Sequence, residues 1–186
     1  LGDFVAPPEA EETCGFRFLE FEEALATVGL TPEKIDIIIH THLHNDHCEN
    51  DYKCTNAEIY VQKAEYEFLL NPHPVDHRYY PDILDGLKVT QVEGDAEIAE
   101  GVRVIFSPGH TVGGQSVAVN TAHGRAVITG FCCNANTCPA KGPAIAPGVH
   151  INLAEAYDTI QKIRAMADIL IPIHDPAVGR KKCIPE

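Results

Sequence analysis

Four side chains that can bind a metal ion fall within six consecutive residues, His42-Leu43-His44-Asn45-Asp46-His47. Neutral imidazole suits zinc and iron, and a carboxylate adds negative charge that compensates the ion. The motif directly follows an isoleucine-rich run at residues 35–39, which predicts a buried strand. No single face of a helix or strand can present all four side chains. A loop over residues 40–51 is therefore expected to turn them inward, with His42 and His44 sharing one ion and Asp46 and His47 facing a neighbouring one.

Two further histidines occur far along the chain, each directly after an apolar run. His110 lies in Ser107-Pro108-Gly109-His110-Thr111, and His174 lies in Ile171-Pro172-Ile173-His174-Asp175-Pro176. In this order behind the first motif, they resemble the metallo-β-lactamase superfamily. The run 94–116 is most similar to the N-acyl homoserine lactonase branch, and the resemblance covers about residues 31–176.

The resemblance implies a hydrolase that uses two divalent metal ions, zinc first and iron as the alternative. Its pattern assigns His42, His44 and His110 to one ion, and Asp46, His47 and His174 to the other. Three protein ligands for each ion leave an open position, as in catalytic sites. A hydroxide held there, its pKa lowered from about 15.7 to about 7, would attack a small ester-like substrate, with a lactone as the first choice. Asp46 would then be both a ligand and a catalytic residue.

One stretch departs from the family's pattern. The family usually has an aspartate that bridges both metals, and Phe131, which cannot bind a metal, occupies that position here. Without that carboxylate, the centre holds one negative charge fewer. A thiolate would restore the balance, and zinc accepts sulfur readily. Cys132 is therefore the candidate seventh ligand, with Cys133 as the other choice, unless both are buried small hydrophobes.

The same motifs leave other functions open. A glyoxalase-like thioesterase is the nearest enzymatic rival, although such enzymes usually add a helical domain for which this chain has little room. An iron-dependent oxidoreductase on the same scaffold is a second alternative, favoured by the sulfur-rich stretch 131–138. A binding or metal-sensing protein without catalysis ranks last, because all six core ligands are present.

The remaining pattern alternates strands and helices. An amphipathic helix is expected from Phe18 to Val28, ended by Gly29, and another from an Asn152–Glu155 cap pair to Ala167. The Pro-rich segment 71–81, with Tyr79 and Tyr80, is expected to be a loop and a candidate lid. Other strands are expected at 58–61, 87–92, 102–106, 116–120, 126–128 and 169–173, and a helix at 62–70. The fold class is α/β, which the resemblance specifies as the four-layer αββα sandwich.

Composition limits the partners. The 186 residues suit one domain, 1–186, and little of 1–17 matches the family's opening strands, so we expect an incomplete N-terminus. A net charge of −13 argues against nucleic acid or a membrane surface, and no apolar run approaches a transmembrane helix. Seven cysteines cannot all pair internally, and we expect a reducing cytoplasm. A small-molecule substrate is the expected partner, and a homodimer is left open.

Overall fold

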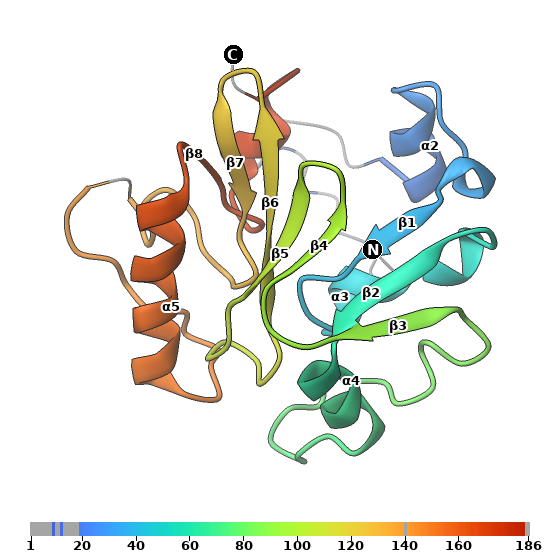
Figure 1. Cartoon of the computed structure of the whole chain (residues 1–186), viewed down its shortest axis with the longest axis horizontal. Coiled ribbons are helices and arrows are strands. Elements are labelled where there is room, and N and C mark those ends of the chain that lie inside the picture. The colour runs from blue at the N-terminus through green and yellow to red at the C-terminus, as the bar shows by residue number, and fades with distance from the viewer. Residues whose placement is uncertain (1–8, 10–11, 13–18, 140, 185–186) are drawn as a thin grey trace.

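The structure is a computed structural model that describes residues 9, 12, 19–139 and 141–184, and it contains two β-sheets (Figure 1). Strands β1 (Ile37–Ile39), β2 (Glu58–Gln62) and β3 (Val89–Val92) form a parallel sheet in the order β1-β2-β3. The second sheet has the order β4-β5-β6-β7-β8. Its strands are β4 (Ala96–Ala99), β5 (Val102–Phe106), β6 (Gln115–Thr121), β7 (Gly124–Ile128) and β8 (Ile169–Ile171). Only β8 is added in parallel, beside β7; the other neighbours are antiparallel.

Helices lie against each sheet and bury separate apolar clusters. Helix α5 (Leu153–Met166) buries Ile160 and Ile163 against Val127 and its neighbours in the five-stranded sheet. Helix α4 (Lys63–Leu70) buries Leu69 in a cluster with Ile59 of β2. Figure 1 shows α5 beside the five-stranded sheet and α4 beside the three-stranded one. This arrangement confirms the expected α/β class with two sheets and flanking helices. A single domain over the whole chain stays a prediction.

Two buried glutamines join the sheets. The Gln115 backbone N–H donates to the carbonyl of Thr41 (2.8 Å), and its side chain donates to the carbonyl of His40 (2.7 Å). Gln62, at the end of β2, donates to the Gln115 side-chain oxygen (2.9 Å). The loop after β1 is therefore fixed against the start of β6, at the place where the histidine motif begins.

Several sequence predictions are confirmed with small changes of boundary. The strand at 102–106 has the predicted limits, and Asn152 caps α5 by accepting from the Glu155 N–H (3.2 Å). The helix expected over 18–28 is shorter, because α2 spans Phe21–Ala26 and Val28 lies beyond it, 70% exposed. Residues 1–8, 10–11 and 13–18 lie outside the described residues. The prediction that the N-terminus is incomplete rests on residues 1–17, most of which are among them, so it stays a prediction.

Three predictions are wrong. The run 35–39 is not a buried strand, because Asp36 interrupts it and β1 starts at Ile37, an edge strand whose first residue is 40% exposed. Residues 40–51 are not all loop, since a short helix α3 (Asn45–Cys48) forms there. Strand β4 was missed, because its sequence Ala-Glu-Ile-Ala has few of the β-branched and aromatic residues that indicate a strand. Among the described residues, three further short elements are η1 (Pro32–Lys34) before β1, η2 (Asp51–Lys53) after α3, and α6 (Pro176–Gly179) just after His174.

Candidate metal centre

The five histidines and Asp46 converge from three separate segments into two adjacent groups. His42, His44 and His110 form a buried set whose ligand atoms lie within 4.8 Å of one another, called the first set below. Asp46, His47 and His174 form a partly exposed set of the same dimensions, called the second set. The rings of His42 and His47 have centroids 4.2 Å apart, so the two sets adjoin.

In the first set, neighbouring groups orient the rings and leave one nitrogen of each for another partner. His44 uses Nε2 on the carboxylate of Asp76 (3.1 Å), and His110 donates from Nδ1 to the carbonyl of Val149 (2.7 Å). His42 uses Nδ1 on the Thr41 hydroxyl (3.1 Å). Its Nε2 is buried without any hydrogen-bond partner in the structure. A buried polar atom without a partner is costly, and a metal ion would satisfy it, so these residues fit a metal.

Asp76 belongs to the same arrangement. Its carboxylate receives the Arg78 guanidinium through Nε and Nη2, both at 2.7 Å. The carbonyl of Arg78 in turn accepts the N–H of Asn45, which begins α3 (2.9 Å). A carboxylate behind a histidine ligand fixes the ring and its tautomer. The segment 71–81 is a loop, as predicted, and Asp76 and Tyr79 bury side chains beside His44.

Burial keeps the first set neutral. It lowers the pKa of His42 well below its usual value, lowers that of His44 to about 4, and also lowers that of His110. Neighbouring imidazoles and Arg78 lower these pKa values further. Neutral imidazole is the form that binds a metal. The site is therefore ready to receive a cation at neutral pH.

The second set has the dimensions of a tetrahedral ligand triangle. His47 Nε2 lies 3.3 Å from Asp46 Oδ2 and 3.3 Å from His174 Nε2, and His174 Nε2 lies 3.9 Å from Asp46 Oδ2. Ligands about 2.05 Å from a zinc ion in tetrahedral geometry are about 3.3 Å apart. The side chains of Asp46 and His174 are 45% and 42% exposed, so this set faces solvent.

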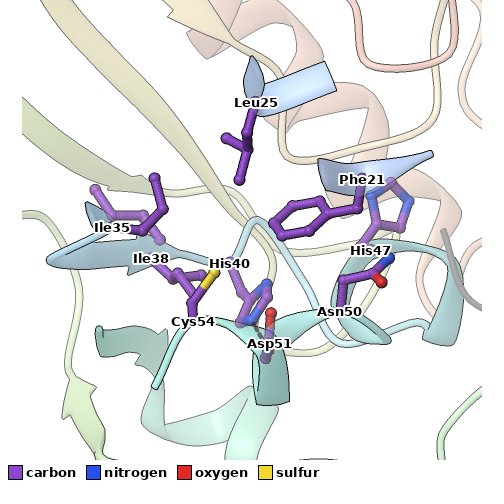
Figure 2. A pocket seen from close by; sticks show the side chains of 10 residues that line it. Phe21, Leu25, Ile35, Ile38, His40, His47, Asn50, Asp51 and Cys54 are labelled. Carbon is purple, nitrogen blue, oxygen red and sulfur yellow. Dashed lines mark hydrogen bonds and ion pairs between the residues drawn. The ribbon is translucent and has the colours of Figure 1, made fainter. Parts of the chain in front are cut away.

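A pocket lies beside His47 (Figure 2). It has a volume of about 320 Å³ and is lined mostly by apolar side chains of α2 and β1, together with the buried His40–Asp51 pair. Figure 2 shows Phe21 and Leu25 of α2 facing Ile38 and His40 across it. His47 lies beside these apolar side chains and is largely buried. Burial lowers its pKa to about 4, although the nearby Asp46 raises it.

Glu65 is a site residue that the sequence reasoning missed. Its carboxylate is fully buried and accepts from the N–H of Leu43 (3.0 Å), the N–H of Gly113 (2.9 Å) and the Tyr79 hydroxyl (2.6 Å). Leu43 lies between two histidines of the first set, and Gly113 follows the third by three residues. Burial raises the pKa of Glu65, and the three donated hydrogen bonds oppose that shift. Its place four residues before Leu69, on the buried face of α4, was the available signal.

Around residue 131 the sequence departs from the family's pattern, and the side chains there face two different ways. Phe131 is 1% exposed and packs with Cys133 and Cys138 in the cluster under α5. Cys132 points the other way, and its Sγ lies 3.3 Å from His110 Nε2. Burial raises the pKa of the Cys132 thiol to about 11. The alternative that these cysteines are buried small hydrophobes is therefore confirmed for Cys133. Cys132 instead lies at the first set.

Comparison with known proteins agrees with this geometry. The family model of the metallo-beta-lactamase superfamily matches residues 13–130. An N-acyl homoserine lactonase of Bacillus thuringiensis is 36% identical over 105 residues, which cover 56% of this chain and 40% of that enzyme. A probable metallo-hydrolase of Methanocaldococcus jannaschii is 26% identical over 165 residues, covering 87% of this chain and 68% of that protein. The chain thus aligns with well under half of the curated lactonase.

Solved structures show the same likeness. An N-acyl homoserine lactone hydrolase, with the product N-hexanoyl-L-homoserine at its catalytic metal centre, has a TM-score of 0.71 and 26% identity, covering 90% of this chain and 67% of that one. The dizinc lactonase AidC shares the fold, with a TM-score of 0.57 at 18% identity over 76% of this chain and 56% of its own.

The fold has two β-sheets with helices against them, and the candidate metal centre lies in segments that follow their strands. Together they define an α/β protein of the metallo-hydrolase class. The family match extends over more than half of the sequence. This chain belongs to the metallo-β-lactamase superfamily, and its relatives include N-acyl homoserine lactonases. Among the described residues, no helix is long and apolar enough to cross a membrane.

Proposed function

We propose that this protein hydrolyses a small ester-like substrate, a lactone, with two divalent metal ions, zinc in the first place. The observation that carries the proposal is the buried His42 Nε2 without a partner, at the point where two three-ligand sets adjoin. In proteins similar over part of this chain, the substrate or product is an N-acyl homoserine lactone or its hydrolysed form. The six ligands would be His42, His44 and His110 in one site, and Asp46, His47 and His174 in the other.

When bound, the ions would supply Lewis-acid polarisation of the carbonyl and lower the pKa of water. The two sets would have different roles. The first set is buried and oriented by Asp76 and the Val149 carbonyl, which makes it the rigid side of the centre. The exposed second set is the side from which a substrate would enter, and Asp46 would contact it there.

A hydroxyl near the entrance can hold the substrate carbonyl. Tyr79 is unsuited, because it is buried and its hydroxyl donates a hydrogen bond to Glu65. Tyr80 is 44% exposed, and its hydroxyl accepts from the Asn45 side chain (3.1 Å). Its own proton remains available to donate. Tyr80 is therefore our candidate for binding the substrate carbonyl, because its partner Asn45 is the residue before Asp46 in α3.

The test is turnover of N-acyl homoserine lactones of short and long chain by zinc-loaded protein, with metal content measured by elemental analysis. We expect ring opening, lost in His47→Ala and kept in His123→Ala, a change in an exposed turn. Hydrolysis of an S-acyl glutathione and of no lactone would assign a thioesterase instead. One bound iron with oxygen consumption would assign an oxidoreductase. A cytoplasmic location and the absence of nucleic-acid partners stay predictions.

A further inference from the structure

The two ligand sets are short of negative charge. They contain one carboxylate, Asp46, and five imidazoles, and an imidazole that binds a metal is neutral. The carboxylate behind His44, Asp76, is already paired with the Arg78 guanidinium, so it adds no net compensation. Two divalent ions would leave a net charge of about +3 at a centre whose first set is buried. Uncompensated charge in such a place is costly, which favours a second anionic ligand.

Cys132 is in position to supply it. Its Sγ lies 3.3 Å from His110 Nε2, the ring nitrogen that the Val149 carbonyl leaves free. For nitrogen and sulfur ligands at zinc distances of about 2.05 and 2.3 Å, the tetrahedral separation is about 3.6 Å. The observed separation is therefore close to that of two ligands of one ion.

The chain around Cys132 is fixed by contacts on both sides. The Gly130 N–H donates to the Ser116 hydroxyl (2.9 Å), and a Cβ at Gly130 would come within 2.2 Å of the Gln115 carbonyl oxygen. Phe131 and Cys133 are both anchored in the core under α5. With its two neighbours held on one side, Cys132 is turned to the other, toward the first set.

We propose that the Cys132 thiolate is a seventh ligand of the metal centre, bound beside His110, and that it supplies the second negative charge. The proposal rests on the proposed function. The partnerless His42 Nε2 in the same set is the independent sign that a cation is bound there. On binding, the S–H bond breaks, the proton passes to water, and the sulfur lone pair forms the bond to the ion.

Cobalt(II) gives a readout that does not depend on activity. A thiolate bound to cobalt(II) produces a sulfur-to-metal charge-transfer band in the near ultraviolet, which nitrogen and oxygen ligands do not. The full chain would be titrated with cobalt(II), and the same titration run on Cys132→Ser, Cys132→Ala and the control Cys183→Ser, an exposed thiol. Circular dichroism would verify that each variant is folded.

We expect the band in the unaltered protein and in Cys183→Ser, and its loss in both Cys132 variants. Removing a supporting group behind a ligand costs 10–100-fold in metal affinity, so the loss of this ligand should lower cobalt affinity by more than about 100-fold at one site. Two bound cobalt ions without the band, or a band that persists in Cys132→Ser, would overturn the ligand while leaving the metal centre intact. No bound cobalt in any variant would overturn the centre and the proposed function together.

Discussion

Replacing Glu65 by glutamine is expected to weaken both the fold and the metal centre. The carboxylate accepts three hydrogen bonds from donors in three segments, and two of those segments carry histidines of the first set. Glutamine has nearly the same shape, but one oxygen becomes an NH2 group that can only donate. In the less damaging orientation the amide nitrogen faces the Gly113 N–H, and two donors then point at each other.

The magnitude follows from these contacts. One buried hydrogen bond to a charged acceptor disappears, worth about 1.5–3 kcal/mol, and buried N–H groups left unpaired cost about 1–3 kcal/mol each. The bonds from Leu43 and Tyr79 survive but lose their charged acceptor. Relief of the buried charge offsets part of the loss. We therefore expect Glu65→Gln to lower the free energy of unfolding by about 3 kcal/mol.

Urea unfolding of the metal-free protein measures this change, and competition against a chromophoric chelator measures zinc affinity. The control is Glu67→Gln, an exposed position on the same helix, which should stay within about 0.5 kcal/mol. We expect Glu65→Gln to bind zinc more weakly, since Leu43 and Gly113 position the flanking ligands. A stability loss below about 1 kcal/mol together with unchanged zinc affinity would refute the reasoning.

Three other changes follow from the structure. Asp76→Asn should lower zinc affinity by about 10–100-fold, because His44 loses its charged support; an unaltered chelator competition would contradict this. The metal-free protein should lose stability as pH falls from 6.5 toward 4, because the unfolded chain binds a proton at His44 first while the folded pKa is about 4. His44 alone contributes about 3 kcal/mol, so a urea midpoint that stays constant over this range would exclude it. Gly109→Ala should destabilise by more than about 2 kcal/mol, since its φ is +113° and a Cβ would lie 2.2 Å from the Ala156 nitrogen in α5. Thermal unfolding measures this change, and Gly148→Ala is the matched control because a Cβ there would meet no other atom. Equal losses of stability in the two variants would show that the contact between residue 109 and Ala156 is unimportant.

The candidate ligands that the structure brings together were found from the sequence, because they occur in short motifs after apolar runs; that they bind metal stays a prediction. The motif at 42–47 contains four possible ligands, and His110 and His174 follow strands in the order that the superfamily resemblance requires. It also indicated Cys132, since Phe131 cannot bind a metal. Element boundaries were less accurate: Asp36 shortens β1, and α3 forms within a segment whose histidines and acids suggested a loop.

What the sequence by itself determined is the chemistry that can be done: imidazoles and a carboxylate at spacings that suit two ions, on an α/β scaffold. Only the tertiary structure decided which groups support them. Glu65 and Asp76 are ordinary acids in the sequence, and their roles arise because folding buries each beside donors from distant segments. It likewise decided that Phe131 and Cys133 face the core while Cys132 faces His110. Hydrogen bonds between remote segments and the direction of a side chain outside regular structure depend on packing, which no local pattern encodes.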